Sequence, residues 1–185
     1  MDDGFSSLKG QLLIASANLS DPNFFRTVVL VTEHTPEGAM GLVLNRPSEL
    51  EVSSAIPELA GLLDGDAPVY IGGPVQPNAV VALAELDDPG RAAALVLGSV
   101  GFIRPDEEPT SLADEISSLR VFAGYSGWGE GQLEAELDEE AWYLEPAQPG
   151  DVFSEQPDGL WAEVLRRKGG PFALLARLPI DPSVN

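Results

Sequence analysis

The sequence contains no cysteine and only one histidine, His34. Without cysteine the chain cannot form a disulfide, a thiolate nucleophile, a zinc–thiolate site or a cysteine-ligated iron–sulfur cluster. A single histidine also excludes a metal site built from several histidines of one chain. We therefore expect no metal site and no cofactor.

Cations are also scarce, with 10 Lys and Arg against 30 Asp and Glu, which gives a formal net charge of −20. Such a charge repels nucleic-acid backbones, so direct binding to nucleic acid is not expected. The main basic run, Arg166-Arg167-Lys168, falls at the end of a predicted helix, where cations complement the helix dipole. A phosphate-binding patch is the alternative interpretation of this run.

Long apolar runs are missing too. No run approaches the roughly 18 residues of a transmembrane helix, so no membrane insertion is expected. The N-terminus is acidic where a signal peptide needs a basic region, which favours a cytoplasmic protein. The 185 residues fit one globular domain, and we expect a loose end over residues 1–8 and a single domain over 9–185.

Short apolar runs separated by glycine and proline predict many strands. A turn at Thr35-Pro36-Glu37-Gly38 predicts a hairpin, and Val28-Val29-Leu30-Val31 lacks alternation, so it is expected to be covered on both faces. The predicted strands are Leu12–Ile14, Val28–Thr32, Gly41–Leu44, Val69–Ile71, Ala79–Leu83, Ala94–Leu97, Val121–Ala123 and Trp142–Leu144.

Helical spacing of apolar residues predicts four helices, at Ser53–Leu63, Ser111–Leu119, Gln132–Ala141 and Gly159–Lys168. A capping-box-like pattern opens the second, and Asp158 is the expected cap of the fourth. The order of elements is not a regular βαβ alternation. It predicts one α/β (α+β) domain with a mixed, mainly antiparallel sheet and helices packed on it.

Two glycine-rich turns are the candidate binding elements. Gly72-Gly73-Pro74 follows a strand and is either a tight turn or an anion-binding nest, although no P-loop lysine follows. The segment Gly124–Gln132 joins a strand to a helix and places Ser126 where a nucleophile elbow would have its serine, but Trp128 stands where the elbow needs glycine. It is either a ligand loop or a structural turn whose aromatics fill the core.

If both strands emerge at one end of the sheet, these turns line a shared groove. The predicted groove residues are Gly72, Gly73, Pro74, Tyr125, Ser126, Trp128, Gly131 and Gln132. His34 and Asn45, which end two neighbouring strands, are secondary candidates. No catalytic residue is assigned, and the carboxylates between Glu134 and Glu140 are interpreted as a solvated helix face.

Several stretches together resemble the YqgE/AlgH family of bacterial proteins over nearly the whole chain. They are Leu8–Asn45, Gly72–Val75, Gly124–Glu134, Trp142 and Asp151–Phe153; the family usually has proline where this chain has Ala17, and often where it has Glu130. The resemblance implies a bent sheet that forms a partial barrel with helices outside. The family is labelled a transcriptional regulator, has no assigned molecular function and offers no catalytic residues to transfer.

Composition and resemblance together favour a non-enzymatic binding or regulatory module that acts through a protein partner or a small ligand. The alternative is an enzyme with an unrecognised site around His34, Asn45 and the glycine-rich loops. An enzyme needs polar groups that converge in a cleft, whereas a binding module needs an exposed apolar surface.

Overall fold

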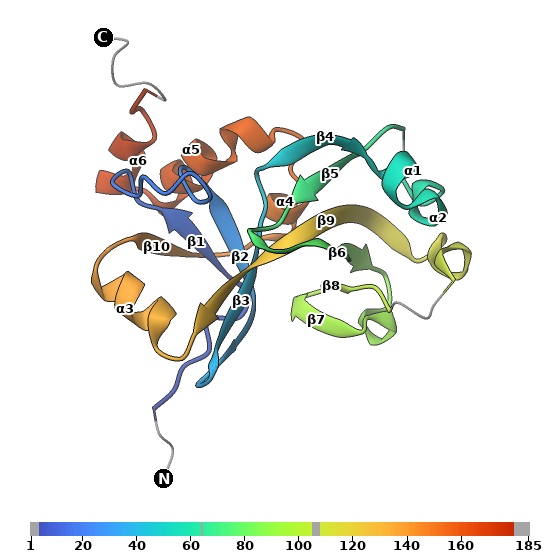
Figure 1. Cartoon of the computed structure of the whole chain (residues 1–185), viewed down its shortest axis with the longest axis horizontal. Coiled ribbons are helices and arrows are strands. Elements are labelled where there is room, and N and C mark those ends of the chain that lie inside the picture. The colour runs from blue at the N-terminus through green and yellow to red at the C-terminus, as the bar shows by residue number, and fades with distance from the viewer. Residues whose placement is uncertain (1–3, 64, 105–107, 180–185) are drawn as a thin grey trace.

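The computed structural model describes residues 4–63, 65–104 and 108–179, in which ten strands form one large sheet flanked by short helices (Figure 1). The strands are β1 (Gln11–Ala15), β2 (Val28–Thr35), β3 (Gly38–Val43), β4 (Pro47–Glu51), β5 (Pro68–Ile71), β6 (Val75–Leu86), β7 (Ala94–Leu97), β8 (Val100–Phe102), β9 (Ile116–Gly129) and β10 (Trp142–Pro146). The helices are α1 (Val52–Ala55), α2 (Pro57–Ala60), α3 (Gln132–Asp138), α4 (Pro149–Val152), α5 (Pro157–Lys168) and α6 (Pro171–Leu175), with 3-10 turns η1 (Pro89–Arg91) and η2 (Pro109–Leu112). Within these ranges no helix has the length and apolarity needed to cross a bilayer.

The strands follow the order β10-β1-β2-β3-β9-β6-β8-β7, and β5 joins β9 from the side with β4 as its own neighbour. Only the pairing of β5 with β9 is parallel among the described strands. The predicted mixed, mainly antiparallel sheet is therefore confirmed. Strand β9 is the longest and pairs with β3, β5 and β6.

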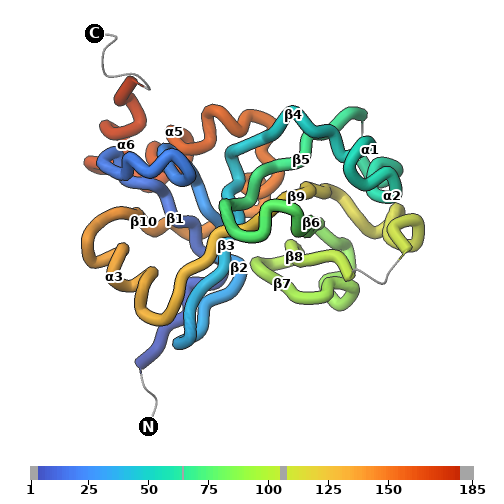
Figure 2. The backbone as a smooth tube through the Cα atoms, in the orientation of Figure 1, coloured from blue at the N-terminus to red at the C-terminus, as the bar shows by residue number. Residues whose placement is uncertain are grey.

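The sheet bends back on itself without closing. Val96 of β7 and Val100 of β8 lie in the same buried cluster as Leu12 of β1 and Leu30 of β2. Figure 2 shows the chain passing from the first strands on one side of the molecule to the elements β4–β8 on the other. The described strands do not pair β7 with β2, so the bent sheet is a partial barrel with an open seam.

Each face of the first strands carries its own apolar core. On one face α5 packs Leu160, Trp161 and Val164 against alternate residues of β1 and β2. The indole Nε1 of Trp161 donates to the carbonyl of Ala15 (2.9 Å). This hydrogen bond fixes α5 at the C-terminal end of β1. On the other face α3 covers a second cluster around Trp128. Because both faces are covered, β2 has the uninterrupted apolar sequence of a fully buried strand, as predicted.

Two predicted helices differ from the structure. The run Ser53–Leu63 forms two short helices, α1 and α2, which are separated at Ile56 because Pro57 has no N–H and disfavours a helical conformation of the residue before it. The helix predicted over Ser111–Leu119 is wrong. Only η2 forms there, and Ile116 already pairs with Leu86 as part of β9. The capping pattern of a single turn cannot outweigh the pairing of β9 with β6, which joins eight residue pairs.

Smaller differences concern the ends of elements. Helix α5 begins at Pro157, and Asp158 lies inside its first turn rather than capping it. Strands β4 and β8 and helices α4 and α6 were not predicted because each has only three to five residues, too few to show a period. The predicted hairpin is confirmed, since Thr35 pairs with Gly38 across a two-residue turn.

Candidate functional site

The turn between β5 and β6 lies directly against β9. The N–H of Gly72 donates to the carbonyl of Ala123 (2.9 Å), and the carbonyl of Gly72 accepts from Oγ of Ser126 (3.1 Å). The structure thus brings two parts of the predicted groove together. Ser126 is fully buried, and its hydroxyl is a donor that joins the turn to β9 rather than an exposed nucleophile.

The backbone of the turn at Gly72–Gly73 and the backbone of β9 approach each other too closely to hold a ligand between them. A Cβ on Gly73, whose φ is +155°, would lie 2.2 Å from the carbonyl carbon of Tyr125. Gly124, with φ +71°, faces the carbonyl of Gly73 from the other side. Beside Gly73 and Pro74 the surface has only a 50 Å³ depression, far below the roughly 300–1,000 Å³ of ligand pockets.

Trp128 is buried in the cluster that α3 covers. Its side chain is 7% exposed and lies against Trp142 in an edge-to-face arrangement with ring centroids 6.1 Å apart. Both indole N–H groups donate to one carboxylate oxygen of Glu136, at 2.9 and 2.8 Å. Glu136 is therefore a structural acceptor, a correction to the expectation that all carboxylates of this helix form a solvated face.

Gly131 and Gln132 complete the start of α3 rather than a groove. Gly131 precedes the helix with φ +70°, and Oε1 of Gln132 accepts from the N–H of Gly129 (3.1 Å). A 250 Å³ depression beside Trp128 is lined by residues of the β2–β3 hairpin. It shares no lining residue with the depression at Gly73, so the described surface does not join the two halves of the predicted groove. A binding role for these residues stays a prediction.

His34 and Asn45 lie at opposite ends of the β2–β3 hairpin, and both make structural contacts. Asn45 bridges the start of β2, accepting from the N–H of Val28 (3.0 Å) and donating to the carbonyl of Arg26 (2.9 Å). His34 pairs with Ala39 at the other end. The polar residues of the enzyme alternative therefore do not converge in one cleft.

The imidazole of His34 connects the N-terminal segment to α3. Its Nδ1 accepts from the N–H of Leu8 (2.9 Å), which leaves the proton on Nε2 for the 2.7 Å contact with Glu134. The backbone carbonyl of His34 accepts from Oγ of Ser7, and the centroid of the Phe5 ring lies 4.8 Å from that of the imidazole. The partners of the His34 ring are thus a backbone N–H and a carboxylate. The described part of the expected loose end, residues 4–8, is held here.

Replacing Glu134 by Gln is expected to remove a pH-dependent part of the stability. The hydrogen bond from its own backbone N–H, then the contact with His34, lowers the pKa of Glu134, while desolvation opposes the shift. A carboxyl with a lowered folded pKa stabilises the fold above its unfolded pKa and loses this as pH falls through the folded pKa. Urea unfolding should therefore separate wild type from Glu134→Gln more at about pH 7 than at about pH 2. The exposed Glu139 supplies the control, and an equal pH response of Glu139→Gln would contradict the prediction.

Several arginines are bound to backbone carbonyls of their own chain. Arg46 donates to the carbonyls of residues 22, 23 and 25, and Arg26 donates to those of residues 178 and 179. Arg120 donates to the carbonyl of Ser154 and lies over the ring of Tyr70. Burial lowers the pKa of Arg120, opposed by nearby Tyr70 and Glu155. These guanidinium groups connect loops to the sheet, so few are left to face solvent.

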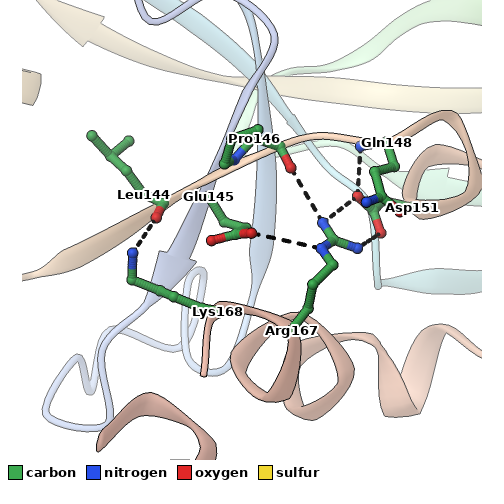
Figure 3. A network of polar contacts seen from close by, with 7 residues as sticks. All are labelled: Leu144, Glu145, Pro146, Gln148, Asp151, Arg167 and Lys168. Carbon is green, nitrogen blue, oxygen red and sulfur yellow. Dashed lines mark hydrogen bonds and ion pairs between the residues drawn. The ribbon is translucent and has the colours of Figure 1, made fainter. Parts of the chain in front are cut away.

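The basic run at the end of α5 is also largely used inside the molecule (Figure 3). Arg167 makes a two-pronged pair with the buried Asp151, at 2.7 and 2.8 Å, and donates to the carbonyl of Pro146. These hydrogen bonds to Asp151 raise the pKa of Arg167, against desolvation. Lys168 donates to the carbonyl of Leu144 (2.6 Å). Two of the three cations thus fix α5 to β10 and α4.

We predict that the purified protein has no appreciable affinity for duplex DNA at physiological salt. Phosphate contacts need free cations, and here the net charge is −20 while most described arginines bind carbonyls or carboxylates. Fluorescence anisotropy with a labelled random-sequence duplex, titrated at two salt concentrations, measures this directly. Sub-micromolar binding that weakens with salt is the contrary result.

A hollow larger than those beside Trp128 and Gly73 lies elsewhere on the described surface, lined by residues of α2, β6, β7 and β8. It is an apolar groove with a volume of 610 Å³. We call it the β6 groove. Its lining residues are Ile56, Glu58, Leu59, Val80, Val81, Ala82, Ala93, Ala94, Phe102, Ile103, Arg104 and Pro109.

Sequence reasoning missed the β6 groove because it depends on how distant elements meet. The helical region at 53–63 and the strand at Ala79–Leu83 were predicted, but β8 is too brief to show a period and the meeting of these elements depends on the bend of the sheet. One signal was available: Val80 and Val81 are β-branched residues in a predicted strand with no predicted cover. Val80 is 42% exposed in the structure.

Solved structures of related proteins have the same fold. A crystal structure of a protein from Corynebacterium diphtheriae superposes with a TM-score of 0.87 at 27% identity, and each chain is covered to 94%. The solution structure of the AlgH protein from Pseudomonas aeruginosa gives a TM-score of 0.71 at 32% identity, covering 96% of this chain and 98% of that one.

Sequence comparisons agree over the full length. A UPF0301 protein of Streptomyces coelicolor is 44% identical over 97% of this chain and 96% of its own. A UPF0301 protein of Thermobifida fusca is 45% identical with the same coverage. The family described as DUF179, AlgH-like, matches residues 12–173. The chain belongs to this AlgH-like family, as the resemblance of its motifs indicated.

Proposed function

We propose that the protein is a non-enzymatic binding module that holds a segment of a protein partner in the β6 groove. The observation that carries the proposal is the groove itself, 610 Å³ in volume and lined mainly by apolar side chains. Ligand pockets have volumes of roughly 300–1,000 Å³. An exposed apolar hollow of this size is typical of an interaction site.

The chemistry of the lining supports binding rather than catalysis. Among its described residues, only Glu58 and Arg104 are ionisable. The lining offers no serine, threonine or histidine that could act as a nucleophile or general base. His34 and Asn45, the polar residues of the enzyme alternative, are both engaged in structural hydrogen bonds. A regulatory role would follow from occupancy of the groove, with the cytoplasm as the proposed compartment, which cell fractionation tests.

A variant that fills the groove tests the proposal. Ala94 lines the groove and is exposed, so Ala94→Trp is expected to block it with little effect on folding. Ala17→Trp introduces the same side chain at an exposed turn after β1 and is the matched control. Quantitative mass spectrometry after affinity capture from the native host should show proteins that wild type and Ala17→Trp retain and Ala94→Trp loses.

Other outcomes separate the alternatives. If all three forms retain the same proteins, the groove is not the binding site. If native mass spectrometry instead finds a small molecule on wild type that is absent from Ala94→Trp, the occupant is a small ligand and the protein-partner part of the proposal is wrong.

A further inference from the structure

We propose that the β6 groove takes its partner segment as an extended strand, which pairs with the free backbone of Val80 and directs a basic side chain toward Glu58. The inference rests on the proposed function, since it assumes that the groove binds a protein. It adds the conformation and the charge of the bound segment.

The groove runs past the edge of the sheet rather than over one face. Val80, Val81 and Ala82 are consecutive residues of β6, and all three line it. Successive side chains of a strand point to opposite faces. Accordingly, Val81 packs against the core under α5, whereas Ala82 packs on the side of α1 and α2. A hollow that touches all three must include the edge of the strand itself.

That edge has a free backbone residue. The N–H of Ile103 donates to the carbonyl of Ala82 (3.1 Å), so the backbone groups of Ala82 point toward β8. Because backbone groups alternate along a strand, the N–H and C=O of Val80, two residues before Ala82, point to the same side of β6 as those of Ala82. On the opposite side of β6, Val80 faces Ala123 of β9. The carbonyl of Ala123 already accepts from the N–H of Gly72. No described residue pairs with Val80 beyond the end of β8, so its N–H and C=O face the groove.

A strand satisfies these groups better than an apolar small molecule does. An apolar occupant would cover the N–H and C=O of Val80 without giving them partners, which is unfavourable. An extended peptide supplies one acceptor and one donor at the spacing of a neighbouring strand, while its side chains enter the apolar pocket beside Val80. The exposed Val80 side chain, 42% accessible, is then covered as well.

Charge selects the kind of peptide. Two copies of this chain would bring two net charges of −20 together, which opposes self-association through this edge. The α2 wall of the groove carries Glu58, and Glu108 precedes the lining residue Pro109. Arg104, the cation of the described lining, follows β8 and donates to the carbonyl of Ala92 (3.4 Å), so the two carboxylates outnumber it. A segment with apolar residues and at least one Lys or Arg is complementary to this wall. The occupant we infer is therefore a basic, apolar, extended segment of a different protein.

The test uses the replacement of Val80 by proline. Val80→Pro removes the N–H that faces the groove, and the bonds between β6 and β9 remain because Val80 makes none of them. Val80→Ala, which shortens the side chain and keeps the N–H, is the matched control. The probe is a synthetic peptide, chosen as the most enriched sequence from a random 12-residue phage library selected on the wild-type protein.

We expect the selected peptide to contain Lys or Arg among apolar residues. Calorimetric titration should give binding to Val80→Pro that is about tenfold or more weaker than to Val80→Ala. N-methylation of the central amides of the same peptide should weaken its binding to wild type similarly. This second measurement decides the question even if the proline variant fails to fold. Glu58→Gln should lower affinity several-fold at low salt and less at high salt.

Each contrary result has a separate meaning. If the N-methylated peptide binds as well as the parent while Ala94→Trp abolishes binding, strand addition is wrong and the proposed function stands. If Ala94→Trp binds every selected peptide as wild type does, the groove is not the site and both proposals fail. If the selected peptides lack basic residues, or if Glu58→Gln has no effect, the inferred charge of the partner is wrong.

Discussion

Trp128→Ala is expected to lower the free energy of unfolding by about 3–5 kcal/mol, the usual cost of truncating a buried Trp. The indole packs against both Trp142 and Phe24, and Trp128 is 7% exposed, so its loss leaves a cavity between β9 and α3. Glu136 also loses one of its two indole donors. Urea-induced unfolding, followed by far-UV circular dichroism, measures the change.

The control for this result is Trp128→Phe. It keeps an aromatic ring in the cluster and removes only part of the indole together with its N–H donor; Glu136 still accepts from Trp142, so the cost should be clearly smaller. If Trp128→Ala kept wild-type stability, Trp128 would be a surface anchor and the cluster around it would not hold α3 on the sheet.

Gly73→Ala is expected to cost about 2–5 kcal/mol, because two penalties add. A methyl group would overlap the backbone of Tyr125, with the nearest atom at 2.2 Å, and backbone atoms cannot rotate away as a side chain can. The φ of +155° is also a conformation that residues with a side chain rarely adopt. Thermal and urea unfolding should both detect the loss.

Gly127→Ala, two residues beyond Tyr125 on β9, is the matched control for this substitution. A Cβ there meets only side-chain atoms at 3.7 and 3.8 Å, which is ordinary contact, so the change should stay within about 0.5 kcal/mol. Similar losses for the two variants would mean that β9 tolerates no added bulk in general, rather than that the crossing at Gly73 is tight.

Much of the fold could be predicted because its strands have strong local signals. The uninterrupted run Val28–Val31 predicts a strand covered on both faces, and the turn before Gly38 predicts the hairpin that forms. The helix predicted at Ser111–Leu119 failed for a reason that one sequence does not display. Ile116 and Leu119 satisfy the apolar spacing of a helix, but they pack in a satellite cluster as part of β9.

The candidate site was less predictable because it depends on distant contacts. Glycines after a strand indicate close approach of the backbone, and the structure shows this at Gly73 and Gly124. What approaches, however, is another stretch of the same backbone. The β6 groove depends on the bend of the sheet and on where β8 stops pairing with β6, and neither has a periodic sequence signal.

The central position of β9 has a consequence for motion. Strand β9 is paired along nearly its whole length, with β6 from Ile116 to Tyr125, with β5 at Phe122 and Ala123, and with β3 from Ser126 to Gly129. Its amide hydrogens therefore exchange for deuterium only when several strands separate, so its protection should approach the global stability. The glycine crossing at Gly73 lies in this slowest unit. The β6 groove is bordered by β7, an end strand of the sheet, and by two single-turn helices, which can open locally at low cost. The molecule therefore combines a rigid crossing with an adaptable rim at the place where a partner would enter.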